Sequence, residues 1–528
     1  MAKPYTITTA ISYPNGRPHI GHAYEAIATD AFARFQRMTG RDVFFQTGTD
    51  EHGLKMAQTA RDKGISPANL AEQMSSCFKE MCNALNISCD RFIRTTEPDH
   101  HRASQALWQA MEANGDLYLG RYEGWYSVRD EAFYDEKELI EGEGGAKLSP
   151  QGTPVEWTVE ESWFFRLSKF QEPLLELYRA HPEFIQPESR RNEVMRFVEG
   201  GLADLSVSRT SFDWGVKVPG SQDHVMYVWV DALTNYLTGC GYPDDADRMA
   251  RYWADNGDII HIIGKDIVRF HAVYWPAFLM SAKLPLPRTV FGHGFLLNRG
   301  EKMSKSVGNV ADPLELAERF GVDQLRYFLL AEVTFGNDGS YSPEAIVLKS
   351  NSDLANSFGN LAQRTLSFIA KNCEGQLTAE GFEPTQDDLD LGRLVRTACA
   401  IEFQERMREF APSAAIEAWM RAVFACNQYI DAQAPWALRK TDPNRMRAVL
   451  AVLYEAIGNL AIAIQPVIPA SAAALLDQMG LPGDVRTYDG IKGRRWYRDL
   501  AASGFVLEAP KPLFPRLELP VGKGASPV

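Results

Sequence analysis

The chain has 528 residues, of which 45% are hydrophobic and 23% charged, the composition of a soluble globular protein with room for three or four domains. No run of about 18 apolar residues is evident, which argues against a membrane span. The net charge of −13 argues against a nucleic-acid partner, but residues 351–528 hold 19 Lys and Arg against 20 Asp and Glu, a net of −1. An acidic total can therefore coexist with one face that accepts RNA.

Cysteine usage and the first residues bear on the compartment. The seven cysteines are odd in number and include no Cys-x-x-Cys pair. The chain enters a predicted strand at Tyr5, which leaves no room for a signal or transit peptide. We therefore expect a cytoplasmic protein. No cysteine lies between Cys89 and Cys240, which excludes a cysteine zinc knuckle in that interval.

The first predicted unit is a strand, a turn and a helix. Residues 5–11 are rich in Thr and Ile, and residues 14–18 contain the Pro, Asn and Gly of a turn. Apolar residues then recur at helical spacing up to Gly40. His19, Gly21 and His22 fall at the strand-to-helix junction, where unpaired N–H groups and the helix dipole favour a phosphate. A capped helix start and two metal ligands three residues apart remain alternatives.

Strands and helices alternate through residue 115, which predicts an α/β fold with a parallel sheet covered on both faces. Residues 43–47 form the next predicted strand, and Asp50 follows its end. Ligands in such sheets collect beyond the carboxyl ends of the strands, so we expect Asp50 to lie near His19 and His22. A carboxylate there could hold an ammonium group. A cap for the following helix is an equally good interpretation.

Residues 116–225 interrupt this alternation and predict an inserted, partly antiparallel module. The parallel sheet is then expected to resume with buried strands at 225–230 and 259–263. Polar residues follow each strand, Asp231 after the first and Gly264-Lys265-Asp266 after the second. Beyond them an aromatic face at helical spacing, from Phe270 to Trp275, is either core or pocket wall.

A loop that begins with glycine follows the predicted strand at 289–297. Its sequence from residue 300 to residue 306 is Gly-Glu-Lys-Met-Ser-Lys-Ser, which places Lys302 and Lys305 three residues apart. Two ammonium groups on a short loop can neutralise charge as it develops on a polyphosphate. An ordinary solvated loop is the alternative. His-Ile-Gly-His at 19–22 and Lys-Met-Ser-Lys-Ser at 302–306 together resemble the paired signatures of class I aminoacyl-tRNA synthetases.

The chain is predicted to be helical from about residue 351, with periodic segments at 393–411, 413–433 and 444–464 that are typical of a helical bundle. We expect a Rossmann-type catalytic domain in two halves, an inserted connective module, a linker to the acceptor stem, a helical anticodon-binding domain and a tail. The expected ranges are 1–115 and 226–306 for the two halves, 116–225 for the module, 307–350 for the linker, 351–510 for the helical domain and 511–528 for the tail.

Further blocks resemble methionyl-tRNA synthetases, and they run from residue 5 to about residue 465: residues 10–16, 50–53, 227–232, 264–268 and 292–294. Synthetases for Leu, Ile and Val carry an editing insertion much longer than the ~110 residues here, and the cysteine pattern cannot make the zinc site of the cysteinyl enzyme. Many members of the family carry zinc knuckles, so the chain resembles the zinc-free subgroup.

The resemblance implies three groups of site residues. The methionine pocket would comprise Ile11, Tyr13, Asp50, Trp229, Tyr236, Phe270, His271 and Trp275, with Ile11 where many members have Leu. ATP would bind at His19, Gly21, His22, Gly264, Asp266, Lys302, Met303 and Lys305, and the catalytic residues would be His19, His22, Lys302 and Lys305. Asp266 is expected to contact either the ribose or the methionine amine. The anticodon would be read by Asn360, Arg364 and Trp436, although a Trp after a proline is also a common packing residue.

The implied activity is methionine activation with ATP and Mg²⁺, followed by transfer to tRNA(Met). The implied protein has no structural zinc and no membrane partner. It would be a monomer, because the appended C-terminal domain that dimerises some members is missing. A small-molecule nucleotidyltransferase and a non-catalytic paralogue that binds RNA are the competing hypotheses. The length and the lysine loop argue against the first, and two intact signatures argue against the second.

Overall fold

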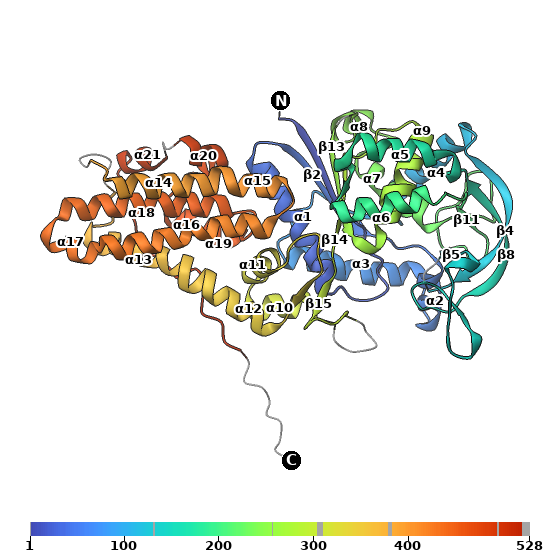
Figure 1. Ribbon diagram of the computed structural model, residues 1–528, viewed down its shortest axis with the longest axis horizontal. Helices are drawn as coiled ribbons and strands as arrows, with labels where there is room; N and C mark the ends of the chain where they lie inside the picture. Colours follow the sequence, from blue (N-terminus) through green and yellow to red (C-terminus); the bar gives the residue numbers. More distant parts are fainter. Residues whose placement is uncertain are drawn as a thin grey trace, which may run out of the picture.

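The computed structural model describes residues 2–129, 132–255, 257–303, 310–377, 383–493 and 496–519. Figure 1 shows an elongated molecule with a helical bundle at one end and a mixed α/β half at the other. The long antiparallel strands β4 (Leu117–Ser127) and β8 (Glu156–Phe165) lie at the edge farthest from the bundle.

A six-stranded sheet forms the centre of the α/β half, and its order is β3-β2-β1-β13-β14-β9. Every neighbouring pair is parallel, as the alternating sequence pattern predicted. The strand order reverses beside β1, where β2 pairs on one side and β13 on the other, and ligands bind at such points. The strands are β1 (Pro4–Thr9), β2 (Asp42–Thr49), β3 (Arg91–Arg94), β9 (Ile185–Gln186), β13 (Asp258–Gly264) and β14 (Thr289–His293).

Both faces of this sheet are buried, which explains the nearly continuous apolar runs of its strands. Successive residues of β13 alternate between two hydrophobic clusters: Ile260 and Ile262 face one, Ile259 and Ile263 the other. Helices α1 and α3 contribute to the first cluster, and α4, α7 and α9 to the second. These helices are α1 (Ile20–Met38), α3 (Pro67–Ala84), α4 (Pro98–Ala113), α7 (Val228–Gly239) and α9 (Trp275–Ala282).

The expectation of a buried parallel strand at 225–230 was wrong. Only β12 (Val225–Met226) is extended, and it pairs antiparallel with β11 (Ser208–Arg209) outside the central sheet. The chain turns into α7 at Val228, and the apolar run continues at helical spacing through Leu233 and Leu237. A short apolar run by itself does not distinguish a strand from a buried helix, and six residues are too few to show helical spacing.

The inserted module contains an antiparallel sheet, as predicted, of order β10-β8-β4-β5. Its outer strands are β5 (Ala132–Tyr134) and β10 (Leu205–Ser206). Two helices follow β8, α5 (Gln171–Ala180) and α6 (Glu188–Glu199), and β9 between them adds the module to the edge of the central sheet.

The C-terminal part is helical, as expected. A continuous helix runs through α12 (Pro343–Lys349), a π-helical stretch (Ser350–Gly359) and α13 (Asn360–Asn372), so no loop marks residue 351. The bundle also contains α14 (Gln386–Thr397), α15 (Phe403–Arg408), α16 (Pro412–Gln433), α17 (Pro435–Thr441), α18 (Pro443–Ile464), α19 (Pro469–Gln478), α20 (Tyr488–Gly493) and α21 (Trp496–Ala502).

Helix α18 is long and apolar enough to cross a membrane by length and composition, contrary to the expectation from the sequence. Among the described residues α18 is the single helix with this property, and 83% of its most apolar 18-residue segment is buried inside the protein. Its apolar character is thus accounted for by its position at the centre of the bundle.

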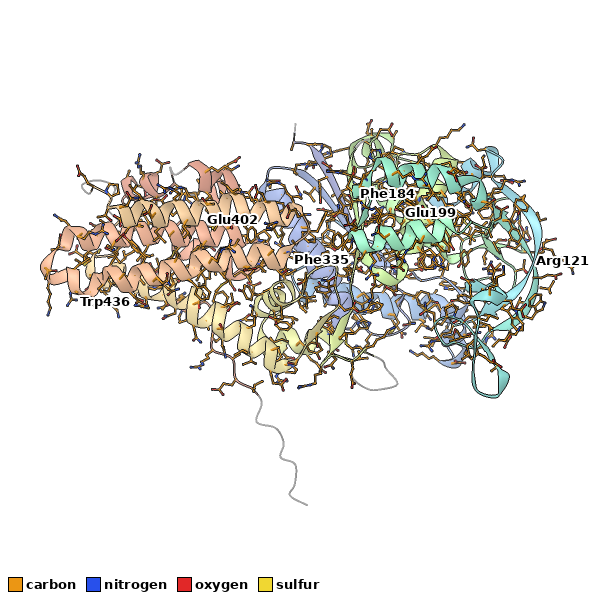
Figure 2. All side chains as sticks on the ribbon, in the orientation of Figure 1. Arg121, Phe184, Glu199, Phe335, Glu402 and Trp436 are labelled. Carbon is orange, nitrogen blue, oxygen red and sulfur yellow. The ribbon has the colours of Figure 1, made fainter. Side chains whose placement is uncertain are left out.

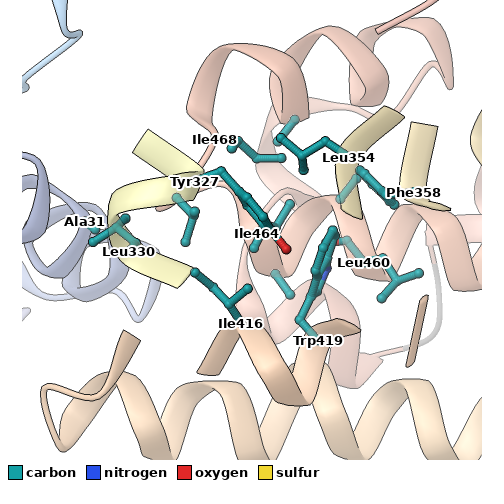
Figure 3. Packing of buried hydrophobic residues seen from close by; sticks show 14 of the residues in the cluster. Ala31, Tyr327, Leu330, Leu354, Phe358, Ile416, Trp419, Leu460, Ile464 and Ile468 are labelled. Carbon is teal, nitrogen blue, oxygen red and sulfur yellow. The ribbon is translucent and has the colours of Figure 1, made fainter. Parts of the chain in front are cut away.

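The two halves share one hydrophobic core. Ala31 of α1 and Leu330 of α11 (Val322–Glu332) belong to the same cluster as Trp419 and Leu460 of the bundle, and Figure 3 shows these residues packed in one region. Arg326 of α11 lies fully buried at this junction. It donates to the Asp30 carboxylate of α1 (2.6 Å) and to the carbonyls of Pro466 (3.1 Å) and Val467 (3.0 Å), just beyond α18.

Candidate active site

The His19–His22 segment forms the start of α1 and is capped by its own imidazoles. His19 is the N-cap residue, and its Nδ1 accepts the backbone N–H of Gly21 (3.0 Å). His22 Nδ1 accepts the N–H of His19 (3.1 Å), so the two side chains form a capping box. A Cβ at Gly21 would lie 2.8 Å from the His19 ring, so this position favours glycine. The capped-start interpretation is therefore correct, and it places both imidazoles at the positive end of the helix dipole.

A cavity of about 380 Å³ lies beside this helix start, at the carboxyl ends of β1 and β13 and against α7. Nine of the predicted residues line it: Ile11, Tyr13, His22, Asp50, Trp229, Tyr236, Gly264, Asp266 and His271. The lining also includes residues that were not predicted from the sequence: Ala10, Ser12, Glu25, Lys55, Arg129, Val228, Ala232, Leu233, Asn235 and Ile267.

Tyr236 and His271 are joined at the inner wall of the cavity. The ring of His271 donates from Nδ1 to the carbonyl of Ile267 (3.0 Å), which leaves Nε2 to accept the hydroxyl of Tyr236 (2.7 Å). Burial lowers the pKa of His271 to about 4, so the imidazole is neutral near pH 7. The Tyr236 hydroxyl therefore donates to a neutral imidazole, and this pair brings no charge to the inner wall.

Phe270 and Trp275 were expected to line the pocket, but neither belongs to its lining, and each contacts a residue that does or a neighbour of one. Phe270 stacks on Trp229 with ring centroids 3.6 Å apart and planes 9° from parallel. Trp275 is fully buried and donates to Nε2 of His261 (3.2 Å). His261 in turn stacks on Tyr236 at 4.1 Å. The helical face therefore supplies His271 to the cavity and Trp275 to the core behind it, while the half-buried Phe270 packs on Trp229.

Asp50 is a buried carboxylate at the end of β2. Its backbone N–H donates to the carbonyl of Ser12 (2.9 Å), which ties it to the segment that follows β1. The next helix, α2 (Leu54–Asp62), has Gly53 at its N-cap, so the alternative role of Asp50 as that cap is wrong. Asp266 lies more exposed at the rim, after β13. The cavity thus combines an inner carboxylate with aromatic walls.

Asp231 of α7 is fully buried and links α7 to two other segments of the chain. It accepts from Nδ1 of His52 (2.6 Å) on one oxygen and from Nε2 of His100 (2.7 Å) on the other. Burial alone would raise the pKa of Asp231, but the two histidines lower it. Through these bonds α7, which carries Trp229 and Tyr236, is held against α4 and the segment that follows Asp50. From the sequence, Asp231 was expected to be a polar residue just after a strand, but its two histidine partners could not be predicted.

The lysine loop begins after β15 (Leu296–Asn298). Arg299 and Gly300 both have positive φ angles (51° and 84°), which makes the turn into the loop. The ammonium of Lys302 lies 5.1 Å from the centre of the Phe295 ring, and Lys265 lies 4.5 Å from the same ring. Met303 is partly buried against the main core. Lys305 lies outside the described residues.

The expected anticodon residues lie on neighbouring helices at the far end of the bundle. Trp436 is 46% exposed, which argues against the packing interpretation. The guanidinium of Arg364 lies 5.5 Å from the centre of its ring and is paired with Asp431 (2.8 Å). Asn360 is exposed one turn before Arg364 on α13. Figure 2 shows Trp436 at the opposite end of the molecule from Arg121 of β4.

Two family models match the chain. One, described as tRNA synthetases class I (M), matches residues 5–366, and the other, described as the anticodon binding domain of methionyl tRNA ligase, matches residues 383–518. A methionine–tRNA ligase of Brucella suis biovar 1 is 58% identical over 513 residues, which cover 97% of this chain and 98% of the relative. The chain belongs to the methionyl-tRNA synthetase family.

Other methionyl-tRNA synthetases are similar over nearly the whole chain. The methionine–tRNA ligase of Rhizobium meliloti is 57% identical over 523 residues, 98% of this chain and 99% of the relative. A solved structure of the Mycobacterium tuberculosis enzyme in complex with methionyl-adenylate is 54% identical with a TM-score of 0.93, covering 97% of this chain and 100% of that one. The resemblance drawn from the two signatures is confirmed.

Proposed function

We propose that the chain activates L-methionine with ATP to give methionyl-adenylate and pyrophosphate, and then transfers the methionyl group to tRNA(Met). The observation that carries this function is the cavity at the start of α1, which joins an inner carboxylate, Asp50, to aromatic walls. Aromatic rings pack well against a thioether, and one carboxylate suits the ammonium group of a free amino acid.

In the first step the methionine carboxylate attacks the α-phosphate of ATP, the new C–O–P bond forms and pyrophosphate leaves. This reaction needs positioning and charge stabilisation and no nucleophile from the protein. Asp50 would orient the ammonium group, and His19 and His22 would hold phosphate at the helix start. Lys302 and Lys305 would stabilise the departing pyrophosphate. Mg²⁺ would enter with the phosphates of ATP and lessen their charge, without a cage of protein ligands.

In the second step a hydroxyl of the terminal adenosine of the tRNA attacks the activated carbonyl, and AMP leaves. The anticodon would be bound at the other end of the molecule by Asn360, Arg364 and Trp436. Single-stranded bases stack on exposed aromatic rings, while amide and guanidinium groups bond to their edges. The half-exposed ring of Trp436 supports this assignment.

An ATP–pyrophosphate exchange assay with each of the 20 amino acids in turn tests the catalytic part. We expect exchange with methionine and at least roughly 10- to 200-fold less with amino acids that fit the pocket less well. Exchange with none of them would favour a non-catalytic paralogue, and faster exchange with another amino acid would contradict the methionine assignment.

We also propose that the protein is a cytoplasmic monomer. Sedimentation of the purified protein would test the oligomeric state.

We further propose that the protein folds without structural zinc, because no cysteine lies between Cys89 and Cys240. Elemental analysis of protein purified without added zinc should show far less than one zinc per chain, and a chelator should leave the melting temperature unchanged. Zinc near one per chain would contradict the proposal.

A further inference from the structure

Helix α17, which carries Trp436, has little packing of its own. It is seven residues long, and among its residues, all of them described, Pro435 is the buried one. Isolated helices of this length are unstable in water. The position of α17 therefore depends on Leu438, which packs against the main core, on a hydrogen bond from Arg439 to Asn372 of α13, and on the segments on either side. On one side lies Gln433, the last residue of α16, and on the other lies Arg445, in the first turn of α18.

The connection from α16 to α17 has an unusual backbone. Ala434 adopts φ 43° and ψ 62°, the left-handed region that residues with a Cβ seldom occupy. Such a conformation persists where the surroundings impose it. The turn that sets the direction of Trp436 is therefore held by contacts outside itself.

A buried carboxylate on a third helix, Asp388 of α14, links the two flanks of α17. Arg445 donates to both of its oxygens, from Nη1 (2.6 Å) and from Nη2 (2.7 Å). The same Nη2 donates to the side-chain oxygen of Gln433 (2.7 Å), and the Gln433 amide donates to Asp387 (3.0 Å). The hydroxyl of Tyr429, one turn before Gln433, also donates to Asp388. The end of α16 and the start of α18 are thus tied to one point.

This network is rigid for two physical reasons. A forked guanidinium bound to both oxygens of a carboxylate fixes direction as well as distance. Asp388 is 4% exposed, and burial alone would raise its pKa, but Arg445 and Tyr429 hold that pKa at about 2. The carboxylate therefore stays charged at neutral pH.

We infer that the Asp388–Arg445–Gln433 network is a positioning device for anticodon recognition, which holds both flanks of α17 so that the Trp436 ring is presented in a fixed orientation to a base. The inference rests on the proposed role of Trp436. It adds residues from α14 and α18 that touch no RNA in this scheme and act through the orientation of one ring.

A double-mutant cycle in the full-length enzyme tests this inference. The measurement is kcat/KM for aminoacylation of tRNA(Met), with pyrophosphate exchange as a separate readout. Gln433→Ala removes the link to the turn but leaves the Asp388–Arg445 pair, so the fold is retained. We expect it to lower kcat/KM roughly 3- to 10-fold, mainly by raising KM for tRNA, and to leave exchange unchanged. In a Trp436→Ala background the same change should have no further effect, because the ring to be positioned is gone.

Matched variants complete the test. Gln465→Ala also removes two hydrogen bonds of a glutamine side chain, to the carbonyls of Ile462 and Arg486 at the other end of α18, and should leave charging unchanged. Arg445→Lys keeps the charge but loses the fork, and it should give a loss like that of Gln433→Ala. Equal losses from Gln433→Ala with and without Trp436 would overturn the inference, as would an unchanged kcat/KM in the single variant. An unchanged kcat/KM in Trp436→Ala would instead overturn the proposed role of that ring.

Discussion

The carboxylate of Asp50 is the one negative charge that our proposal assigns to methionine binding. A hydrogen bond between two charged groups is worth about 1.5–3 kcal/mol, so Asp50→Asn should raise KM for methionine at least ~10-fold in pyrophosphate exchange. KM for ATP should change little. Asp266→Asn is the matched variant at the rim: a higher KM for ATP would assign it to ribose, and a higher KM for methionine would assign it to the amine. An unchanged methionine KM in Asp50→Asn would contradict the assignment.

His271 makes stability depend on pH. Its pKa is about 4 in the folded protein and ~6.5 in an unfolded chain, so the unfolded state binds more protons between these values. The contribution, on the order of 3 kcal/mol, is complete above pH ~6.5 and is lost as the pH falls towards 4. The melting temperature should therefore fall less between pH 6.5 and 4.5 in His271→Gln than in the wild type. His181→Gln, at an exposed histidine, is the control and should show the wild-type fall.

At the scale of single elements, α11 is the helix that joins the two halves, and Arg326 is its critical residue. Removing one partner of a buried ion pair leaves an uncompensated charge, which typically costs about 3–5 kcal/mol. In Arg326→Met, Asp30 keeps its bonds to Arg34 and Ser88, but it loses its fully buried partner, and the carbonyls of Pro466 and Val467 lose their donor. The substitution should therefore lower the free energy of unfolding by about 3 kcal/mol, the lower end of that range. Urea denaturation followed by circular dichroism measures it.

The control for this prediction is a surface pair in the same protein. Arg421 of α16 pairs with Glu402 at an exposed position, and Arg421→Met should cost no more than about 1 kcal/mol. Similar losses in the two variants would mean that the buried pair contributes no more than an exposed one.

Helix α7 shows how far sequence patterns determine an element. The apolar run at 225–230 fits a buried strand as well as the start of a buried helix, and α7 begins within it at Val228. In the folded protein Asp231 bonds to His52 and His100, whereas Tyr236 of the same helix bonds to His271. These distant partners cannot be read from the apolar run itself.

At the scale of the whole molecule, α17, which carries Trp436, and α1, beside whose start the cavity lies, belong to different halves (Figure 1). The two halves share one core (Figure 3). Trp436→Ala should lower tRNA charging roughly 10- to 100-fold, because base–aromatic stacking is worth about 1–3 kcal/mol. Pyrophosphate exchange without tRNA should keep its rate. The ring is 46% exposed, so the melting temperature should change little. Trp157→Ala, at an exposed Trp of the connective module, should leave charging unchanged, and normal charging in Trp436→Ala would contradict anticodon stacking.

Local patterns in the sequence determined the strand-turn-helix unit at His19–His22, the parallel sheet and the helical bundle, because periodicity and turn chemistry act over a few residues. The resemblance to known motifs also selected nine residues of the cavity lining. Only the tertiary structure decided that Arg129 of the inserted module reaches the cavity and that Trp275 lies behind it. The same holds for Arg326 and Asp30, which are 296 residues apart, and for the network around Asp388. Such contacts depend on how whole elements pack, and no local pattern encodes which distant side chain will be the partner.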